Sequence, residues 1–213
     1  MSKKKISKHN QNRLYARRIT ETIDKALDHY PRLLALRIDL RFPDEEDRLD
    51  CPTRYYAGSD VISLFINSVK SQIEEDIKRK IKAGKTTLTC YVRFVWVREF
   101  NQEGSKKHYH VLLLLNKDAY AWPGLRQTDT FYDRYTLFQM VINAWLRAIN
   151  RADKENKYHG LVHMPQKGYY QLNRKKPDFK ATYEELTERA MYLAKERSKD
   201  SSDGQRSFGC SQY

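Results

Sequence analysis

The sequence has few cysteines and lacks any long apolar run. Its three cysteines, Cys51, Cys90 and Cys210, are odd in number and widely spaced. This argues against a disulfide framework and against a zinc site built from cysteines. A bilayer span needs about 20 consecutive apolar residues, and no stretch of the chain approaches that length. The simplest expectation is a protein that works in a reducing interior.

Other patterns that the sequence lacks restrict the possible domain organisation and the possible functions. The chain has no internal repeat and no long low-complexity linker. Its basic N-terminus is not followed by an apolar segment, so it does not have the pattern of a secretory signal. The sequence also lacks the phosphate-binding pattern G-x-x-x-x-G-K-[ST] of helicase motors. One domain of ordinary size, without a motor of its own, is therefore expected.

Acidic residues are outnumbered by basic ones. Forty Lys and Arg face 27 Asp and Glu, which gives a formal net charge of +13. Such an excess favours a polyanionic partner, most commonly nucleic acid, over a solubility charge or an acidic protein partner. The first 20 residues hold seven Lys or Arg and no acid, which indicates either an arm that lies along phosphates or a solubilising tail.

The periodicity of apolar residues predicts an α+β domain. Helical spacing occurs at residues 11–29, 61–83, 131–150 and 183–199, and strand-like patterns occur at residues 32–42, 86–100 and 108–115. The short segments 160–165 and 168–174 are expected to form a strand pair around a turn. The Ser/Gly-rich tail is expected to be irregular. This order suits helices packed on a largely antiparallel sheet.

Two histidines stand at the start of the apolar segment KKHYHVLLLLN, residues 106–116. Side chains alternate between the two faces of a strand, so His108 and His110 share one face and Tyr109 points to the other. Two imidazoles at this separation can bind one metal ion. Taken alone, the pattern is more often two ordinary strand histidines.

A carboxylate is predicted beside this pair. A two-residue turn at positions 103–104 would pair residues whose numbers sum to 207, which places Glu99 opposite His108 and on the same face. Two histidines and one carboxylate, with coordination positions left open, suit Mg²⁺ or Mn²⁺. A register shift of one residue would turn Glu99 away, and Glu99 could instead pair with Lys106 or Lys107.

The last predicted helix carries a tyrosine beside charged residues. Tyr192 lies on a polar stripe, one turn from both Glu188 and Lys195. Its side chain either anchors packing or acts as a nucleophile whose developing charge Lys195 neutralises. Glu188 either activates a water molecule or is a surface acid paired with a base.

These segments together resemble the HUH endonuclease superfamily of rolling-circle replication initiators. In particular, REFNQEGSKKHYHVLLLLNKDAY, GLVHMP, YLAK and RSFGCS, in this order, are similar to replication-initiator-like proteins of filamentous phages and cryptic prophages. The resemblance covers roughly residues 30–210. It implies an HUH/RRM-like fold of about five strands flanked by helices, with a helical basic N-terminal extension.

The resemblance also implies roles for individual residues. His108 and His110 would bind Mg²⁺ or Mn²⁺, with Glu99 as third ligand and His163 as the competing candidate. Tyr192 would attack a phosphodiester to form a 5′-phosphotyrosyl link, and Lys195 would neutralise charge there. The paired-tyrosine form of the family has a second tyrosine one turn away, where this chain has Glu188. That difference leaves open how the covalent link is resolved.

The expected substrate is single-stranded or hairpin origin DNA in the cytoplasm of a bacterial host, with a host helicase and polymerase as partners. Exposed aromatic side chains beside basic ones suit such DNA through stacking and phosphate contacts, or else the same tyrosines fill the edge of the core. The candidates for DNA binding are Lys106, Lys107, Arg54, Tyr55, Tyr56, Lys167, Tyr169, Tyr170, Arg174 and Lys175.

The expected organisation is a basic arm and helix at residues 1–30, a nickase domain at 31–200 and an irregular tail at 201–213. An inactive DNA-binding regulator of the same fold is the alternative function. An RRM-like RNA-binding protein is disfavoured, because HYHVLLLLN lacks the basic-glycine-aromatic pattern of such proteins.

Overall fold

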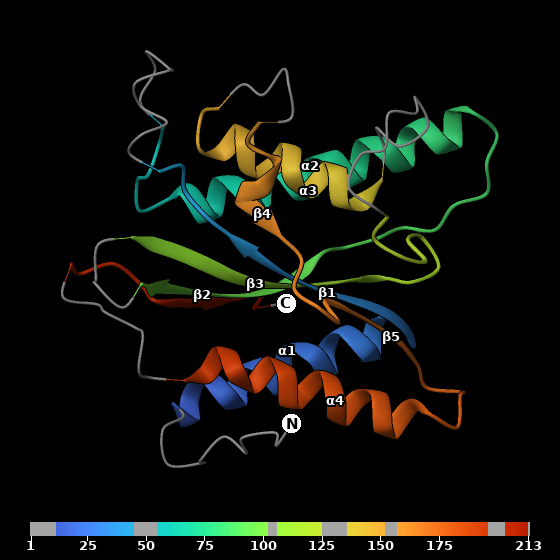
Figure 1. Cartoon of the computed structure of the whole chain (residues 1–213). Helices are drawn as coiled ribbons and strands as arrows, with labels where there is room; N and C mark the ends of the chain where they lie inside the picture. The colour runs from blue at the N-terminus through green and yellow to red at the C-terminus, as the bar shows by residue number, and fades with distance from the viewer. Residues whose placement is uncertain are drawn as a thin grey trace.

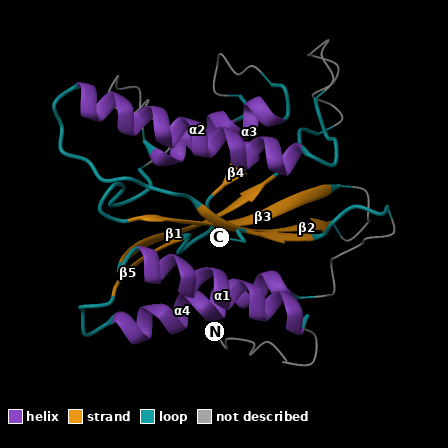
Figure 2. Ribbon diagram, turned by 180° about the vertical axis from the view of Figure 1, so that it is seen from behind, coloured by secondary structure: helices purple, strands orange, loops and turns teal. Residues whose placement is uncertain are grey.

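The structure, a computed structural model, describes residues 12–44, 55–101, 106–124, 136–151, 157–195 and 203–212. It is an α+β sandwich in which an antiparallel sheet lies between two layers of helices (Figures 1 and 2). Helices α2 and α3 cover one face, and α1 and α4 cover the other. None of the helices in these described ranges is long and apolar enough to cross a membrane.

The helices and strands follow one another in the order α1, β1, α2, β2, β3, α3, β4, β5, α4 and β6. The helices are α1 (Arg13–His29), α2 (Val61–Lys82), α3 (Leu137–Ala148) and α4 (Phe179–Met191), with short 3-10 helices η4 (His159–Leu161) and η5 (Tyr192–Ala194). The strands are β1 (Arg32–Leu40), β2 (Arg93–Phe100), β3 (Lys107–Asn116), β4 (Val162–His163), β5 (Tyr169–Asn173) and β6 (Phe208–Cys210).

The central strand of the sheet is β3, in the order β4-β1-β3-β2-β6. Its pairing with β2 places Glu99 opposite His108 and Val97 opposite His110. The predicted register of this hairpin is therefore confirmed. A central strand is held by hydrogen bonds on both sides, so the two histidines lie on a backbone that has little freedom to move.

The expected strand pair after α3 is wrong, because β4 and β5 do not pair with each other. Both lie antiparallel to β1, with β4 beside Asp39 and Leu40 and β5 beside residues 32–36. Gly168 makes this arrangement possible, since a Cβ atom there would lie 2.4 Å from Met164 Cγ. The Gly168 carbonyl accepts a hydrogen bond from the backbone N–H of Arg37 at 2.6 Å, in the gap between the two short strands.

The two faces of the sheet bury separate cores. Residues such as Ile38, Tyr109 and Val111 pack against α2 and α3. Their neighbours along the strands, such as Val97 and Leu112, pack against α1 and α4. This alternation is what the strand patterns predict. Helix α1 contributes fully buried Ile and Leu side chains to the second core, so residues 13–29 form part of the layered domain.

Helix α4 ends earlier than its sequence pattern predicts. It runs from Phe179 to Met191, continues for one 3-10 turn, and has an extended conformation at Lys195. The carbonyl of Ala194 accepts a hydrogen bond from the backbone N–H of Asn12 at 2.8 Å. In a continuing helix that carbonyl would accept a bond from residue 198. The contact with the start of α1 therefore replaces the next helical turn.

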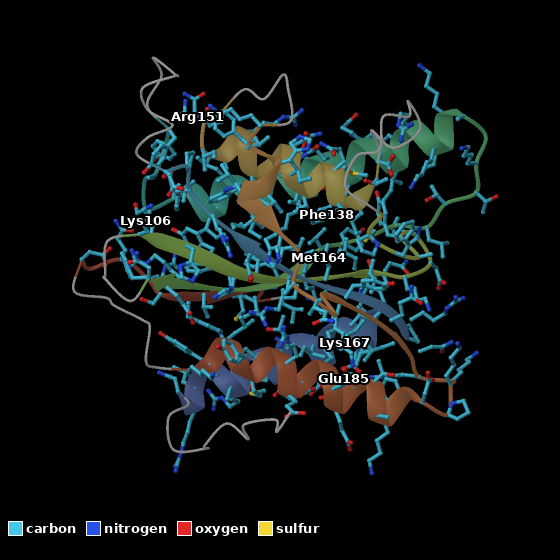
Figure 3. The ribbon with its side chains drawn as sticks, in the orientation of Figure 1. Lys106, Phe138, Arg151, Met164, Lys167 and Glu185 are labelled. Atoms are coloured by element: carbon cyan, nitrogen blue, oxygen red, sulfur yellow. The ribbon has the colours of Figure 1, made fainter. Side chains whose placement is uncertain are left out.

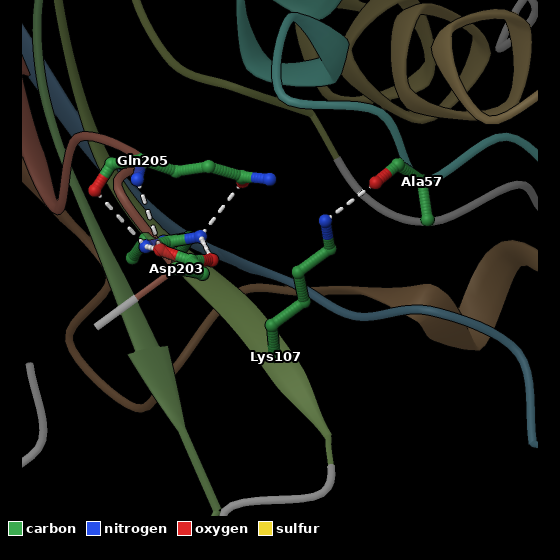
Figure 4. Close-up of polar contacts among 5 residues, drawn as sticks. Ala57, Lys107, Asp203 and Gln205 are labelled. Atoms are coloured by element: carbon green, nitrogen blue, oxygen red, sulfur yellow. Dashed lines mark hydrogen bonds and ion pairs between the residues drawn. The ribbon is translucent and has the colours of Figure 1, made fainter. Parts of the chain in front are cut away.

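The tail is not irregular throughout, which corrects the sequence prediction. Strand β6 pairs with residues 95–97 of β2, and Gly209 lies so close to Trp96 that a Cβ atom would meet its ring at 2.5 Å. The tail is held by Arg98, which is 1% exposed. Its guanidinium binds both carboxylate oxygens of Asp203 at 2.5 and 2.8 Å, and also the side chain and carbonyl of Gln205 (Figure 4).

The boundaries of two further elements differ from the sequence prediction. Strand β2 begins at Arg93 instead of near residue 86, and residues 85–92 have no regular structure. Helix α3 begins at Leu137, with Thr136 as its N-cap. The earlier part of that predicted helix, residues 131–135, lies outside the described residues.

We predict that Asp203→Asn lowers stability in a pH-dependent way. The hydrogen bonds from Arg98 hold the pKa of Asp203 down at about 2, below the ordinary value of about 3.9. The ionised carboxylate therefore stabilises the fold above about pH 4, and this contribution is lost as the pH falls toward 2. Melting temperatures of the native chain and the variant should differ at pH 7, and the difference should shrink below about pH 4 and vanish only below about pH 2.

Asp28→Asn is the matched control, because Asp28 forms an ion pair with Arg174 in which both side chains are largely exposed. Such pairs contribute little to stability, so this variant should melt close to the native chain. Equal melting temperatures for Asp203→Asn and the native chain at pH 7 would contradict a stabilising role for the Arg98 contact.

Candidate functional site

Ionisable side chains gather on the sheet face that α1 and α4 cover. Asp39 of β1 lies opposite His110 of β3 on one side and opposite His163 of β4 on the other. Glu99 of β2 lies opposite His108 of β3. Because residues paired across antiparallel strands share a face, all five side chains project from the same side of the sheet.

Glu99, His108 and His110 come together as a possible metal-binding triad. Glu99 Oε2 lies 3.4 Å from His110 Nε2 and 4.0 Å from His108 Nε2. The two imidazole rings are 4.9 Å apart and nearly perpendicular. One ligand atom from each residue lies within 4.8 Å of the other two, and this is the one such group among the described residues. The prediction that Glu99 faces the histidines is confirmed.

The triad is buried at one end and open at the other. The side chains of Glu99 and His110 are 9% and 12% exposed, and that of His108 is 27% exposed. Burial lowers the pKa of His108, and the neighbouring His110 lowers it further. His108 is thus kept neutral, which is the form that binds a metal. A metal held here could be reached by a substrate from the His108 side.

Asp39 belongs to this candidate site, although the sequence pattern did not predict it. Its Oδ1 lies 2.5 Å from His110 Nδ1. An Nδ1–H that donates to Asp39 leaves the lone pair of Nε2 facing Glu99. A lone pair and a carboxylate repel each other unless a proton or a cation lies between them. A protonated His110 that donates to Glu99 satisfies this contact, and a divalent cation bound by both groups satisfies it equally, with Asp39 in the orienting position common behind metal-binding histidines.

The pKa of Asp39 agrees with the orienting role, whereas the pKa of His110 is raised, which favours a ring proton that a metal ion at Nε2 would have to displace. Burial lowers the pKa of His110, but hydrogen bonds to Asp39 and Glu99 outweigh it, so the net direction is upward. Burial raises the pKa of Asp39, yet its bond to His110 and the charge of Arg37 outweigh that effect and lower it. Asp39 therefore stays ionised, as an orienting carboxylate must.

His163 lies outside the triad. Its Nδ1 is 3.7 Å from Asp39 Oδ2, on the opposite side of Asp39 from His110, and its side chain is 48% exposed. The geometry therefore favours Glu99 over His163 as the third ligand of a metal bound by His108 and His110.

Arg37 connects the triad to Tyr192. Its Nη2 lies 3.7 Å from Asp39 Oδ1, and its guanidinium carbon lies 5.6 Å from the centre of the Tyr192 ring. Lys195 Nζ lies 3.4 Å from the same ring centre. Burial lowers the pKa of Arg37, which is 6% exposed. The tyrosine and the triad are thus linked by consecutive contacts through Asp39 and Arg37.

Tyr192 is not a packing anchor. It is 39% exposed, whereas the next residue, Leu193, is 1% exposed and fills the core. Glu188 lies exposed on α4, one turn before Tyr192. The short 3-10 turn after α4 buries Leu193 and leaves Tyr192 partly exposed, with Arg37 and Lys195 against its ring.

The predicted DNA-binding residues at the start of β3 and before α2 have varied surroundings. Lys106 forms an ion pair with Asp44. Lys107 is partly buried, and its amine donates to the carbonyl of Ala57 at 2.5 Å (Figure 4). The Tyr56 hydroxyl donates to Asp60. Tyr55 lies beside Phe42, with ring centres 5.7 Å apart. Arg54 lies outside the described residues.

The candidates near β5 divide into two groups. Lys167 binds Glu185 of α4 at 3.1 Å (Figure 3), and the neighbouring Tyr169 is exposed. Tyr170 is 7% exposed and belongs to the core.

Arg174 and Lys175 are exposed at the other end of β1, beside Arg32. Seven residue rises separate Arg32 from Asp39, about 23 Å along the strand. The structure therefore does not bring Arg174 and Lys175 to the triad.

Comparison with known proteins identifies close relatives. Residues 1–211 match the model of the YagK/YfjJ C-terminal domain. The chain is 35% identical over 201 residues to the uncharacterized protein YagK of Escherichia coli K12, covering 93% of this chain and 92% of YagK. It is 36% identical over 202 residues to the uncharacterized protein YfjJ of the same strain, covering 93% of each. No solved structure matches the chain.

We predict that Asp39→Asn weakens Mn²⁺ binding by about 10- to 100-fold, the usual cost of removing a residue that orients a metal-binding histidine. Asparagine keeps the size of the side chain but loses the charge that holds His110 in place. Isothermal titration calorimetry measures the affinity, and Asp28→Asn is the control that removes an exposed carboxylate elsewhere. An unchanged affinity would rule out the orienting role of Asp39.

We also predict that Glu99→Gln weakens Mn²⁺ binding more than His163→Ala does, because Glu99 belongs to the triad and His163 lies behind Asp39. The same titration compares the two variants, with circular dichroism to show that each remains folded. The opposite order of affinities would assign the third ligand to His163.

Proposed function

The chain belongs to the YagK/YfjJ C-terminal domain family, and we propose that it is a metal-dependent DNA nickase that uses a single tyrosine. Its reaction initiates rolling-circle replication of a phage, a prophage or another mobile element. The proposal takes up the resemblance of HYH and YLAK to HUH endonucleases and adds the positions of these residues in space.

One observation carries the proposal, namely that residues of two motifs more than 80 residues apart in the sequence are joined by consecutive contacts. The triad of Glu99, His108 and His110 reaches Tyr192 through Asp39 and Arg37. A tyrosine nucleophile, two histidines with a carboxylate, and cations against the tyrosine ring are the groups that phosphodiester cleavage requires.

Individual residues of the chain have distinct roles in the proposed cleavage. Tyr192 attacks the phosphorus with its hydroxyl oxygen, so that a bond from the tyrosine oxygen to phosphorus forms and the bond to the 3′-oxygen breaks. The phenolic proton passes to solvent, and the 3′-oxygen takes up a proton to leave as a hydroxyl. Lys195 and Arg37 lie against the Tyr192 ring and stabilise negative charge that develops there.

The triad would hold Mg²⁺ or Mn²⁺, which supplies polarisation of the phosphate oxygen and stabilisation of the leaving 3′-oxygen. His108 and His110 present ring nitrogens, and Glu99 presents one carboxylate oxygen. Three protein ligands leave coordination positions for substrate oxygens, as Mg²⁺ and Mn²⁺ sites commonly do.

The substrate that suits this site is single-stranded or hairpin origin DNA. The free 3′-hydroxyl would prime a host polymerase, and a host helicase would unwind the duplex, because the sequence has no helicase phosphate-binding loop. The net charge of +13 supports DNA as the partner. The place of action would be the cytoplasm of a bacterial host.

We predict that Tyr192→Phe abolishes cleavage of single-stranded origin DNA in the presence of Mn²⁺, because phenylalanine keeps the ring but lacks the attacking oxygen. Gel electrophoresis of labelled oligonucleotides measures cleavage. Tyr91→Phe is the matched control, since Tyr91 is 66% exposed and lies before the start of β2, far from Glu99. Its cleavage rate should equal that of the native chain.

Cleavage by Tyr192→Phe at the native rate would remove Tyr192 as nucleophile. If the native chain binds the DNA but does not cut it, whichever divalent ion is added, the protein is instead an inactive DNA-binding regulator of the same fold.

A further inference from the structure

Two arginines close to Tyr192 have side-chain donors that make no hydrogen bond within the described residues. Arg37 on β1 and Arg189 on α4 each have a buried Nε atom, and neither atom has a hydrogen-bond partner within the described part of the chain. Arg189 precedes Tyr192 by three residues and therefore shares its side of the last helical turn. Arg37 lies below the Tyr192 ring, at 5.6 Å from its centre.

The charges here do not balance within the described residues. The positive charge of Arg189 is close enough to lower the pKa of Arg37, after the larger effect of burial. The nearest carboxylate to Arg37 is Asp39, at 3.7 Å, and Asp39 also holds His110. Lys195 adds a third cation against Tyr192. Like charges close together oppose folding. An anion bound at the terminal Nη atoms would offset these charges, although the Nε atoms themselves are shielded from solvent.

Carboxylates on α4 do not supply this anion. Glu185 forms its ion pair with Lys167 at the surface (Figure 3), and Glu188 points into solvent from its exposed position. A guanidinium presents its donors as a planar fork that matches two oxygens of a phosphate. We call these two arginines, of which Arg37 is buried and Arg189 half-buried, the phosphate seat. Tyr192, which is partly exposed, lies next to Arg37.

We propose that Arg37 and Arg189 form a binding site for a backbone phosphate of single-stranded DNA, next to Tyr192. The inference rests on the proposed function for the identity of the DNA, and it adds a binding step that needs no metal. The seat orients the strand so that a phosphodiester lies between the tyrosine hydroxyl and the triad. Binding in EDTA and cleavage in Mn²⁺ therefore depend on different residues.

The test is fluorescence anisotropy of a labelled single-stranded oligonucleotide with the full chain in EDTA. Arg189→Gln should weaken binding about tenfold or more, since it removes hydrogen bonds from a charged donor to a phosphate. The slope of log K against log salt should fall by about 0.7, the value for one lost phosphate contact on a single strand. Arg37→Lys keeps the charge and loses the fork, so it should weaken binding with little change in the salt slope.

Arg147→Gln is the matched control, because Arg147 is an exposed arginine on α3, in the opposite helical layer. It should bind the oligonucleotide as the native chain does. Native affinity and salt slope in Arg189→Gln would overturn the phosphate seat. Circular dichroism of each variant distinguishes lost binding from lost folding, and a folded Arg37→Lys with native affinity would likewise exclude Arg37.

The experiments distinguish a failure of the phosphate seat from a failure of the nickase proposal. If Arg189→Gln loses metal-free binding but the native chain cuts no DNA with Mn²⁺, the seat stands and the nickase is excluded. If the native chain cuts DNA and Arg189→Gln binds and cuts equally well, the nickase stands and the seat is excluded.

Discussion

The contact between the Asp39 carboxylate and His110 is the interaction on which the site depends. It fixes which nitrogen of His110 faces Glu99, and it neutralises part of the charge of buried Arg37. Asp39 can do both because β1 lies between β3 and β4 in the sheet. The pairing of β1 with β3 thus joins a metal-binding pair of histidines to a guanidinium that reaches the tyrosine on α4.

Much of the site could be predicted because it is local in sequence. The register of the hairpin from β2 to β3 follows from a short turn, and side-chain alternation then puts Glu99 and both histidines on one face. Asp39 could not be found in that way, because its pairing with His110 joins segments about 70 residues apart. The single acidic residue in the stretch RLLALRIDLRF was the one available signal.

The same distinction explains the errors in the predicted fold. The end of α4 depends on a hydrogen bond from Asn12, at the other end of the chain. Strand β6 depends on the contact between Arg98 and Asp203, and the positions of β4 and β5 depend on the free edge of β1. Periodicity within a segment carries no information about such partners, although it predicted the four α-helices of the described residues and the central strands.

The central claim is that the chain forms a covalent bond to DNA through Tyr192 in a metal-dependent reaction. The most direct measurement is to trap the adduct with single-stranded origin DNA and Mn²⁺, digest it, and identify the linked residue by mass spectrometry. A phosphorylated nucleotide on the peptide that contains YLAK is the predicted result. A link to any other residue, or cleavage that leaves no protein–DNA adduct, would contradict it.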